Sequence, residues 1–163
     1  MKVRPITESG VREDLTYNQD GRSVLVVGVD GSPPSWDAFA WAAGEARRCQ
    51  GRMIAVFVTP MVDPMAAVGV TAPLASGALE AAKAQMAEEI AAEVGRRGAE
   101  LGVDVRFIRE YGEVARALTR VAAAAHADLV AVGRSAKALH HVAGSLSRRL
   151  VLSRDLPVLV VVP

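Results

Sequence analysis

The C-terminal stretch from Asp128 to Pro163 constrains the fold most, because it reads as strand, glycine-bearing loop, helix and strand in succession. Its first run, 129–132, is short, apolar and rich in β-branched residues, which is typical of a strand covered on both faces of a parallel sheet. A second run, PVLVVV at 157–162, closes the chain. Between them an amphipathic segment carries Leu146 and Leu150 on one face, which predicts a helix.

The loop inside this unit leaves its strand at Gly133 and enters the helix at Gly144 and Ser145. A serine there can cap the helix while its first N–H groups stay free. Free amides at a helix start attract anions, because the backbone can approach closely and the helix dipole favours negative charge. The pattern therefore predicts a cradle for phosphate.

The rest of the chain repeats the alternation of strand and helix. Further apolar runs at 24–29, 53–58 and 103–108 alternate with helical segments at 33–50, 75–101 and 114–125. Right-handed crossovers leave few other solutions, so this order predicts one open, five-stranded parallel sheet with helices on both faces. The helix positions expected to face the sheet are Trp36, Phe39, Ala40, Ala43, Leu79, Ala82, Met86, Ile90, Val94, Leu101, Val114, Leu118, Val121 and Ala125.

Composition narrows the classes of function. The 163 residues predict one domain, and 19 basic against 18 acidic residues remove the electrostatic case for nucleic-acid binding. Aromatic residues make up only 4% of the chain, too few for base-stacking platforms. The single cysteine, Cys49, excludes an intramolecular disulfide and favours a reducing compartment.

No apolar run approaches the ~20 residues of a membrane span, and the charged opening contains no signal-peptide core. We therefore expect a cytoplasmic protein that does not associate with a membrane. Residues 1–22 lack a sustained apolar period and are expected to form a flexible N-terminal extension, with the folded domain at residues 23–163. An arm laid along a partner subunit is the alternative for the extension.

Asp30 is the most informative residue of the first half. It ends the first apolar run, at the carboxyl end of a strand beside the point where the chain reverses direction across the sheet, where doubly wound folds bind ligands. Ser32 and Pro33 fit the N-cap and first position of the next helix. Asp30 can also cap its own turn within the sequence DGS, and both interpretations remain open.

A search for catalytic patterns finds none. The chain has no H-E-x-x-H, G-x-S-x-G or G-x-x-x-x-G-K-S/T motif, so metalloprotease, hydrolase and P-loop chemistry lack support. His126 suits the end of a helix dipole, while His140 and His141 lie in the glycine loop beside Lys137 and Arg134, near phosphate or in solvent. We predict no catalytic residue and no metal ligand.

Four motifs in order, VLVVGVDGSPPS, ADLVAVG, the loop closing in GS and the terminal PVLVVV, resemble the universal stress protein family from Ser23 to Pro163. The resemblance implies a Rossmann-like sheet with strand order 3-2-1-4-5. In nucleotide-binding members the loop reads G-x2-G-x9-G-S/T. Here it reads G-x2-A-x7-G-S, with Ala136 in place of the second glycine and two residues fewer.

The resemblance implies a stress-response regulator that binds ATP or AMP, with magnesium only alongside ATP. The residues implied to hold the nucleotide are Asp30, Val58 through its backbone, Gly133, Ala136, Gly144 and Ser145. The methyl group of Ala136 and the shorter loop restrict the approach of phosphate, so ATP binding is expected to be weaker. The alternatives are a dimeric module that acts through an unknown protein partner without nucleotide, and a weak ATPase or nucleotidyl-transferase-like enzyme.

The final run also predicts a homodimer. PVLVVV carries no charge and no polar alternation, and the implied strand order places it at a sheet edge. An uncovered edge of this kind presents unpaired N–H and C=O groups, whereas antiparallel pairing with a second copy satisfies them across a two-fold axis. In the alternative, the N-terminal extension covers the edge and the chain stays monomeric.

Overall fold

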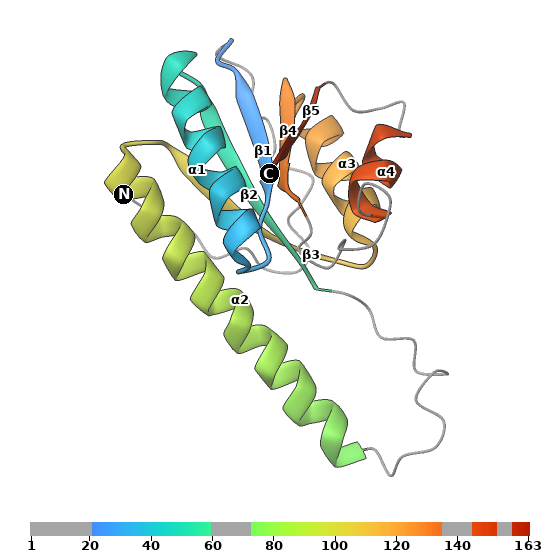
Figure 1. Cartoon of the computed structure of the whole chain (residues 1–163). Coiled ribbons are helices and arrows are strands. Elements are labelled where there is room, and N and C mark those ends of the chain that lie inside the picture. Colours follow the sequence, from blue (N-terminus) through green and yellow to red (C-terminus); the bar gives the residue numbers. More distant parts are fainter. Residues whose placement is uncertain (1–20, 60–72, 135–144, 153–157) are drawn as a thin grey trace.

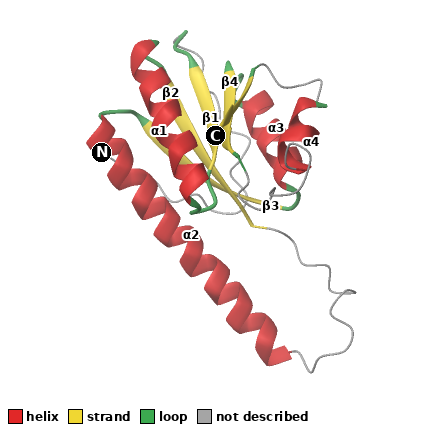
Figure 2. Ribbon diagram, viewed as in Figure 1, coloured by secondary structure: helices red, strands yellow, loops and turns green. Residues whose placement is uncertain are grey.

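The computed structural model describes residues 21–59, 73–134, 145–152 and 158–163, and it shows a parallel sheet between two layers of helices (Figure 1). The strands are β1 Val24–Gly28, β2 Arg52–Thr59, β3 Val105–Tyr111, β4 Leu129–Gly133 and β5 Leu159–Val162. The helices are α1 Pro33–Arg48, α2 Pro73–Leu101, α3 Val114–Ala124 and α4 Ser145–Val151. Figure 2 shows the strict alternation of the two element types along the chain.

The sheet has the order β3-β2-β1-β4-β5, and every neighbouring pair is parallel. The predicted doubly wound, Rossmann-like fold and its strand order are therefore confirmed. The chain builds outward from β1 through β2 to β3 and then returns to the other side of β1 for β4 and β5. The helices that follow β1 and β4 consequently lie on opposite faces of the sheet, which leaves space at the carboxyl ends of these two strands.

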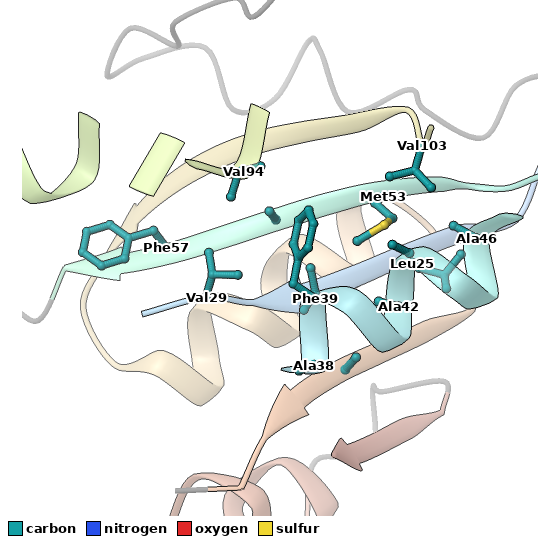
Figure 3. Packing of buried hydrophobic residues seen from close by; sticks show 14 of the residues in the cluster. Leu25, Val29, Ala38, Phe39, Ala42, Ala46, Met53, Phe57, Val94 and Val103 are labelled. Atoms are coloured by element: carbon teal, nitrogen blue, oxygen red, sulfur yellow. The ribbon is translucent and has the colours of Figure 1, made fainter. Parts of the chain in front are cut away.

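Both faces of the central strands are buried, as the unbroken apolar runs predict. Alternate residues of β1 point to opposite sides: Leu25 packs with α1 and α2, while Val26 packs with α3 and α4. Phe39 of α1 is fully buried among strand residues on the first side (Figure 3). Burying a phenylalanine side chain stabilises the fold by ~1.5–3 kcal/mol.

Helix α1 presents a stripe of alanines to the sheet, with Ala38, Ala42 and Ala46 all buried. The expectation for Ala40 is wrong, because that residue is exposed. It lies one position outside the face set by Phe39 and Ala43, both of which are buried as expected. Small side chains along the buried face let the helix backbone come close to the sheet.

Helix α2 follows the expected helical period but not the expected burial. Ile90 and Val94 are buried, whereas Leu79 is 48% exposed, Met86 is 52% exposed and Ala82 is also exposed. The N-terminal half of α2 extends past the end of the sheet (Figure 1). Periodicity identifies the apolar face of a helix, but it does not tell how much of that face has a partner.

Strand β3 lies two to three residues later than the predicted run 103–108 and continues to Tyr111. Its end carries Glu110 on the same face as Ile108, and Glu110 is buried with its carboxylate paired to Arg120 of α3. A charged residue inside a strand hides the apolar signal, so the sequence pattern ends the strand too early. Helix α3 buries Leu118, Val121 and Ala125 as predicted.

None of the helices in the described ranges is both long and apolar enough to cross a membrane. Residues 1–20, which make up nearly all of the expected N-terminal extension, lie outside the described part of the chain.

Candidate functional site

A cleft of about 370 Å³ opens where the strand order reverses between β1 and β4. It lies at the carboxyl ends of the strands, the position at which open parallel α/β sheets bind ligands. The described residues that line it are Gly28, Val29, Asp30, Ser32, Pro34, Ser35, Val56, Val58, Val114, Leu118, Val132, Gly133, Arg134 and Leu146.

One side of the cleft is apolar. Val56 and Val58 come from β2, Val114 and Leu118 from α3, and all four belong to or pack against the core on the α3 side of the sheet. The same core therefore continues into the wall of the cleft. A surface of branched aliphatic side chains suits a flat, weakly polar ring better than a charged group.

The turn after β1 organises the polar side. The backbone N–H of Ser32 donates to Oδ1 of Asp30 at 3.0 Å, and the Ser32 hydroxyl donates to the same oxygen at 2.5 Å. Gly31 between them has φ +83°, a left-handed conformation that glycine adopts without strain. Asp30 thus caps its own turn and also lines the cleft, while its contact with a ligand stays a prediction.

The hydrogen bonds also set the charge of Asp30. Partial burial alone would raise the pKa of its carboxyl, but the bonds from the Ser32 hydroxyl and N–H, together with Ser35 and the backbone of Asp30 itself, outweigh it. The pKa of Asp30 therefore lies below the ordinary value of 3.8. The cleft holds an ionised carboxylate at neutral pH.

The first turn of α1 offers no free donors to an anion. Pro33 and Pro34 have no N–H, and the N–H groups of Ser35 and Trp36 both donate to the Ser32 carbonyl, at 3.0 and 3.1 Å. Ser32 occupies the N-cap position as predicted, although its hydroxyl bonds to Asp30 and not to the helix backbone. The anion-binding capacity common at helix starts is absent from this helix.

Gly133 brings β4 close to the same turn. A Cβ atom added there would lie 2.2 Å from the carbonyl oxygen of Pro34, 2.3 Å from its carbonyl carbon and 2.8 Å from the nitrogen of Ser35. Only a glycine lets the end of β4 approach the backbone of α1 this closely. Gly133 thus lets the end of β4 pack against the first turn of α1 beside the cleft.

The structure brings together three of the residues singled out by sequence: Asp30, Val58 and Gly133 all line the cleft. Ser145 begins α4, and its neighbour Leu146 lines the cleft. Ala136 and Gly144 lie outside the described residues, as do His140 and His141.

Sequence reasoning did not assign Ser35, the apolar wall or Arg134 to the site. Ser35 is buried, accepts a hydrogen bond from the N–H of Asp30 at 3.3 Å and donates to the Ser32 carbonyl at 2.8 Å. Arg134 is exposed and directly follows Gly133. The signal that could have identified Arg134 is its position next to Gly133, a predicted site residue.

An open parallel sheet covered on both faces, with a cleft at the reversal of strand order, defines a doubly wound α/β protein of the kind that binds ligands at this point. Residues 22–162 match the universal stress protein family, and the chain belongs to that family.

Solved structures show the same fold. A protein of the universal stress protein family from Burkholderia pseudomallei is 24% identical, with a TM-score of 0.67 over 91% of this chain and 97% of that one. A universal stress protein family protein from Arabidopsis thaliana with AMP bound is 14% identical, with a TM-score of 0.62 over 86% and 92% of the two chains. The universal stress protein from Archaeoglobus fulgidus in complex with dAMP is 19% identical, with a TM-score of 0.57 over 87% and 98%. A comparison with curated proteins found no match.

Proposed function

We propose that this chain is a cytoplasmic stress-response regulator that binds an adenine nucleotide in the cleft between β1 and β4. The observation that carries the proposal is the meeting of an ionised carboxylate, Asp30, with an apolar wall in one cleft at the reversal of strand order. AMP and dAMP bound to the relatives from Arabidopsis thaliana and Archaeoglobus fulgidus support the choice of ligand.

The chemistry of the lining matches the parts of a nucleotide. The adenine ring packs against Val58 and Val114, the half-buried members of the apolar wall, where its apolar faces replace water. The Asp30 carboxylate has only acceptor oxygens, so it pairs with the hydroxyl donors of the ribose. The cleft volume of about 370 Å³ falls within the ~300–1,000 Å³ usual for ligand sites.

The phosphates point toward the segment between Gly133 and Ser145 in this proposal. ATP with magnesium brings more negative charge than AMP, while the first turn of α1 contributes no N–H group. We therefore expect AMP to bind at least as tightly as ATP. Catalysis is not proposed, because Asp30 is the one carboxylate among the described lining residues and an ATPase needs further groups aimed at the phosphates.

Calorimetric titration tests the proposal. AMP, and ATP with Mg²⁺, are titrated into the native chain, into Asp30→Asn and into Asp37→Asn, a control at an exposed position of α1 outside the cleft lining. We expect AMP to bind the native chain and the control equally. Asp30→Asn should bind it about tenfold more weakly, because hydrogen bonds to a charged acceptor are roughly twice as strong as neutral ones. A native chain that takes up neither nucleotide at millimolar concentration refutes the proposal.

The second candidate function is a dimeric interaction module, and the position of β5 at the edge of the sheet favours it. β5 is an edge strand whose Val161 is 40% exposed, and Val158 just before the strand is 52% exposed. Val151 and Leu152, at the end of the preceding α4, are exposed at 70% and 71%. Antiparallel pairing of β5 with a second copy covers these side chains and satisfies the edge hydrogen bonds. Light scattering that gives the mass of one chain at micromolar concentration rejects this candidate.

A further inference from the structure

The described lining of the cleft contains two charged residues of opposite sign. Asp30 follows β1, and Arg134 follows β4, the strand paired with β1. Val27 pairs with Ala131, and each charged residue stands three positions further along its own strand. The two residues therefore occupy equivalent positions after paired strands, and both line the cleft at the point where the strand order reverses.

The backbone of Arg134 is held firmly while its side chain is exposed. Its N–H donates to the Val162 carbonyl of β5 at 2.8 Å, and the preceding Gly133 lies against the backbone of Pro34. No interaction of its guanidinium with another described residue is present. The backbone of Arg134 is thus anchored at the end of β4, and its exposed side chain lines the cleft.

The first turn of α1 supplies no N–H group to an anion. Pro33 and Pro34 have no N–H, and the next two N–H groups of α1 donate to Ser32. A phosphate on the α1 side of the cleft therefore gains no donor from that helix start, and a side-chain cation is the charge that can bind it there. Arg134 is the one cation among the described lining residues.

We propose that Arg134 binds the 5′-phosphate of the nucleotide and thereby makes this cleft select nucleotides over nucleosides. The inference rests on the proposed function and adds a specificity-determining residue to it. A guanidinium presents a planar fork of N–H donors that matches two phosphate oxygens, whereas a lysine offers only a compact charge. With the ribose against Asp30 and the phosphate against Arg134, each charge of the cleft meets the part of the ligand that it complements.

The test compares AMP with adenosine, which lacks the phosphate. Both are titrated calorimetrically into the native chain, Arg134→Gln, Arg134→Lys and the control Arg116→Gln, an exposed arginine of α3 outside the cleft lining. We expect the native chain to bind AMP at least tenfold more tightly than adenosine. Arg134→Gln should remove this preference and leave the affinity for adenosine unchanged within about twofold. Arg134→Lys should keep part of the preference for AMP, and the control should match the native chain.

Phosphorus NMR of bound AMP gives a second measurement that loss of structure alone would not reproduce. The second pKa of a phosphate monoester is ~6, and a guanidinium beside it stabilises the dianion and lowers that pKa. The native complex should show a lowered phosphate pKa, and Arg134→Gln a value close to that of free AMP.

The outcomes separate the two proposals. If the native chain binds neither AMP nor adenosine, the proposed function itself fails. If the native chain binds both with equal affinity, or if Arg134→Gln keeps the preference for AMP and the lowered phosphate pKa, nucleotide binding stands and the role of Arg134 is refuted.

Discussion

Replacing Gly133 by alanine tests the packing on which the cleft depends. The added Cβ would lie 2.2 Å from the Pro34 oxygen and 2.8 Å from the Ser35 nitrogen, where carbon contacts are normally ~3.5–4 Å. The atoms that it meets are helix backbone, so a change of rotamer cannot relieve the clash. The first turn of α1 must move away from β4 by more than about 1 Å, although α1 is held by the fully buried Phe39.

The expected cost comes almost entirely from this contact. Gly133 does not have a positive φ, so alanine itself adds no backbone strain. Overpacking a core side chain costs ~1–3 kcal/mol, and a clash with fixed backbone belongs at the upper end, so we expect a loss of about 3 kcal/mol in the free energy of unfolding. For a domain of this size that loss lowers Tm by ~6–12 °C. The variant should also bind AMP poorly, because the displaced helix carries Ser35 and follows the Asp30 turn.

Urea unfolding monitored by circular dichroism measures the change, with Gly77→Ala as the matched control. Gly77 lies on an exposed position of α2, and a Cβ there would meet nothing within 4 Å. Alanine should stabilise that helix by ~0.5–1 kcal/mol. If Gly133→Ala unfolds at the same urea concentration as the native chain, with an unchanged slope, the close approach of β4 to α1 is not a constraint and the reasoning is refuted.

Further variants test other parts of the chain. Gly98→Ala should destabilise the fold, because the new Cβ would lie 2.3 Å from Val105 Cγ1. Val105→Ala should relieve that clash, so a double-mutant cycle measured by urea unfolding should give a favourable coupling of about 1 kcal/mol or more. Additive effects of the two substitutions contradict the contact. Because the pKa of Asp30 is lowered, its carboxylate stabilises the fold above the ordinary pKa of 3.8, and this effect is lost as pH falls through the lower pKa of the folded state. The difference in free energy of unfolding between the native chain and Asp30→Asn should therefore shrink in acid. A difference that grows in acid contradicts this prediction. Val161→Lys should convert a dimer into a monomer in light scattering without loss of helical signal, and an unchanged dimer places the interface elsewhere. Deleting residues 1–20 should change Tm by only a few degrees, and loss of cooperative unfolding shows that the segment packs on the domain.

The fold could be predicted because its signals are local. Each central strand is buried on both faces, so β1, β2 and β4 appear as unbroken apolar runs, and the helices between them keep a helical period. The rules for parallel crossovers then leave few arrangements. The charged end of β3 at Glu110 and the exposed half of α2 with Leu79 and Met86 were missed. The pairing of a buried carboxylate with Arg120 and the length of α2 that meets the sheet are properties of the assembled fold.

The site could be predicted only in part, because its geometry depends on contacts between distant segments. Asp30 stood out because it follows a buried strand directly. The approach of Gly133 to Pro34 joins residues that are far apart in the sequence, and no local pattern records it.

That contact changes the interpretation of the glycine. A glycine after β4 suggests room for phosphate, whereas here the space beside it is filled by the α1 backbone. The two prolines of α1 and the glycine of β4 thus act together, since the prolines remove donors from the helix start and the glycine lets that start close one side of the cleft. An anion on the α1 side of the cleft finds no N–H group at that helix start, and Arg134 is the cation that the described lining provides.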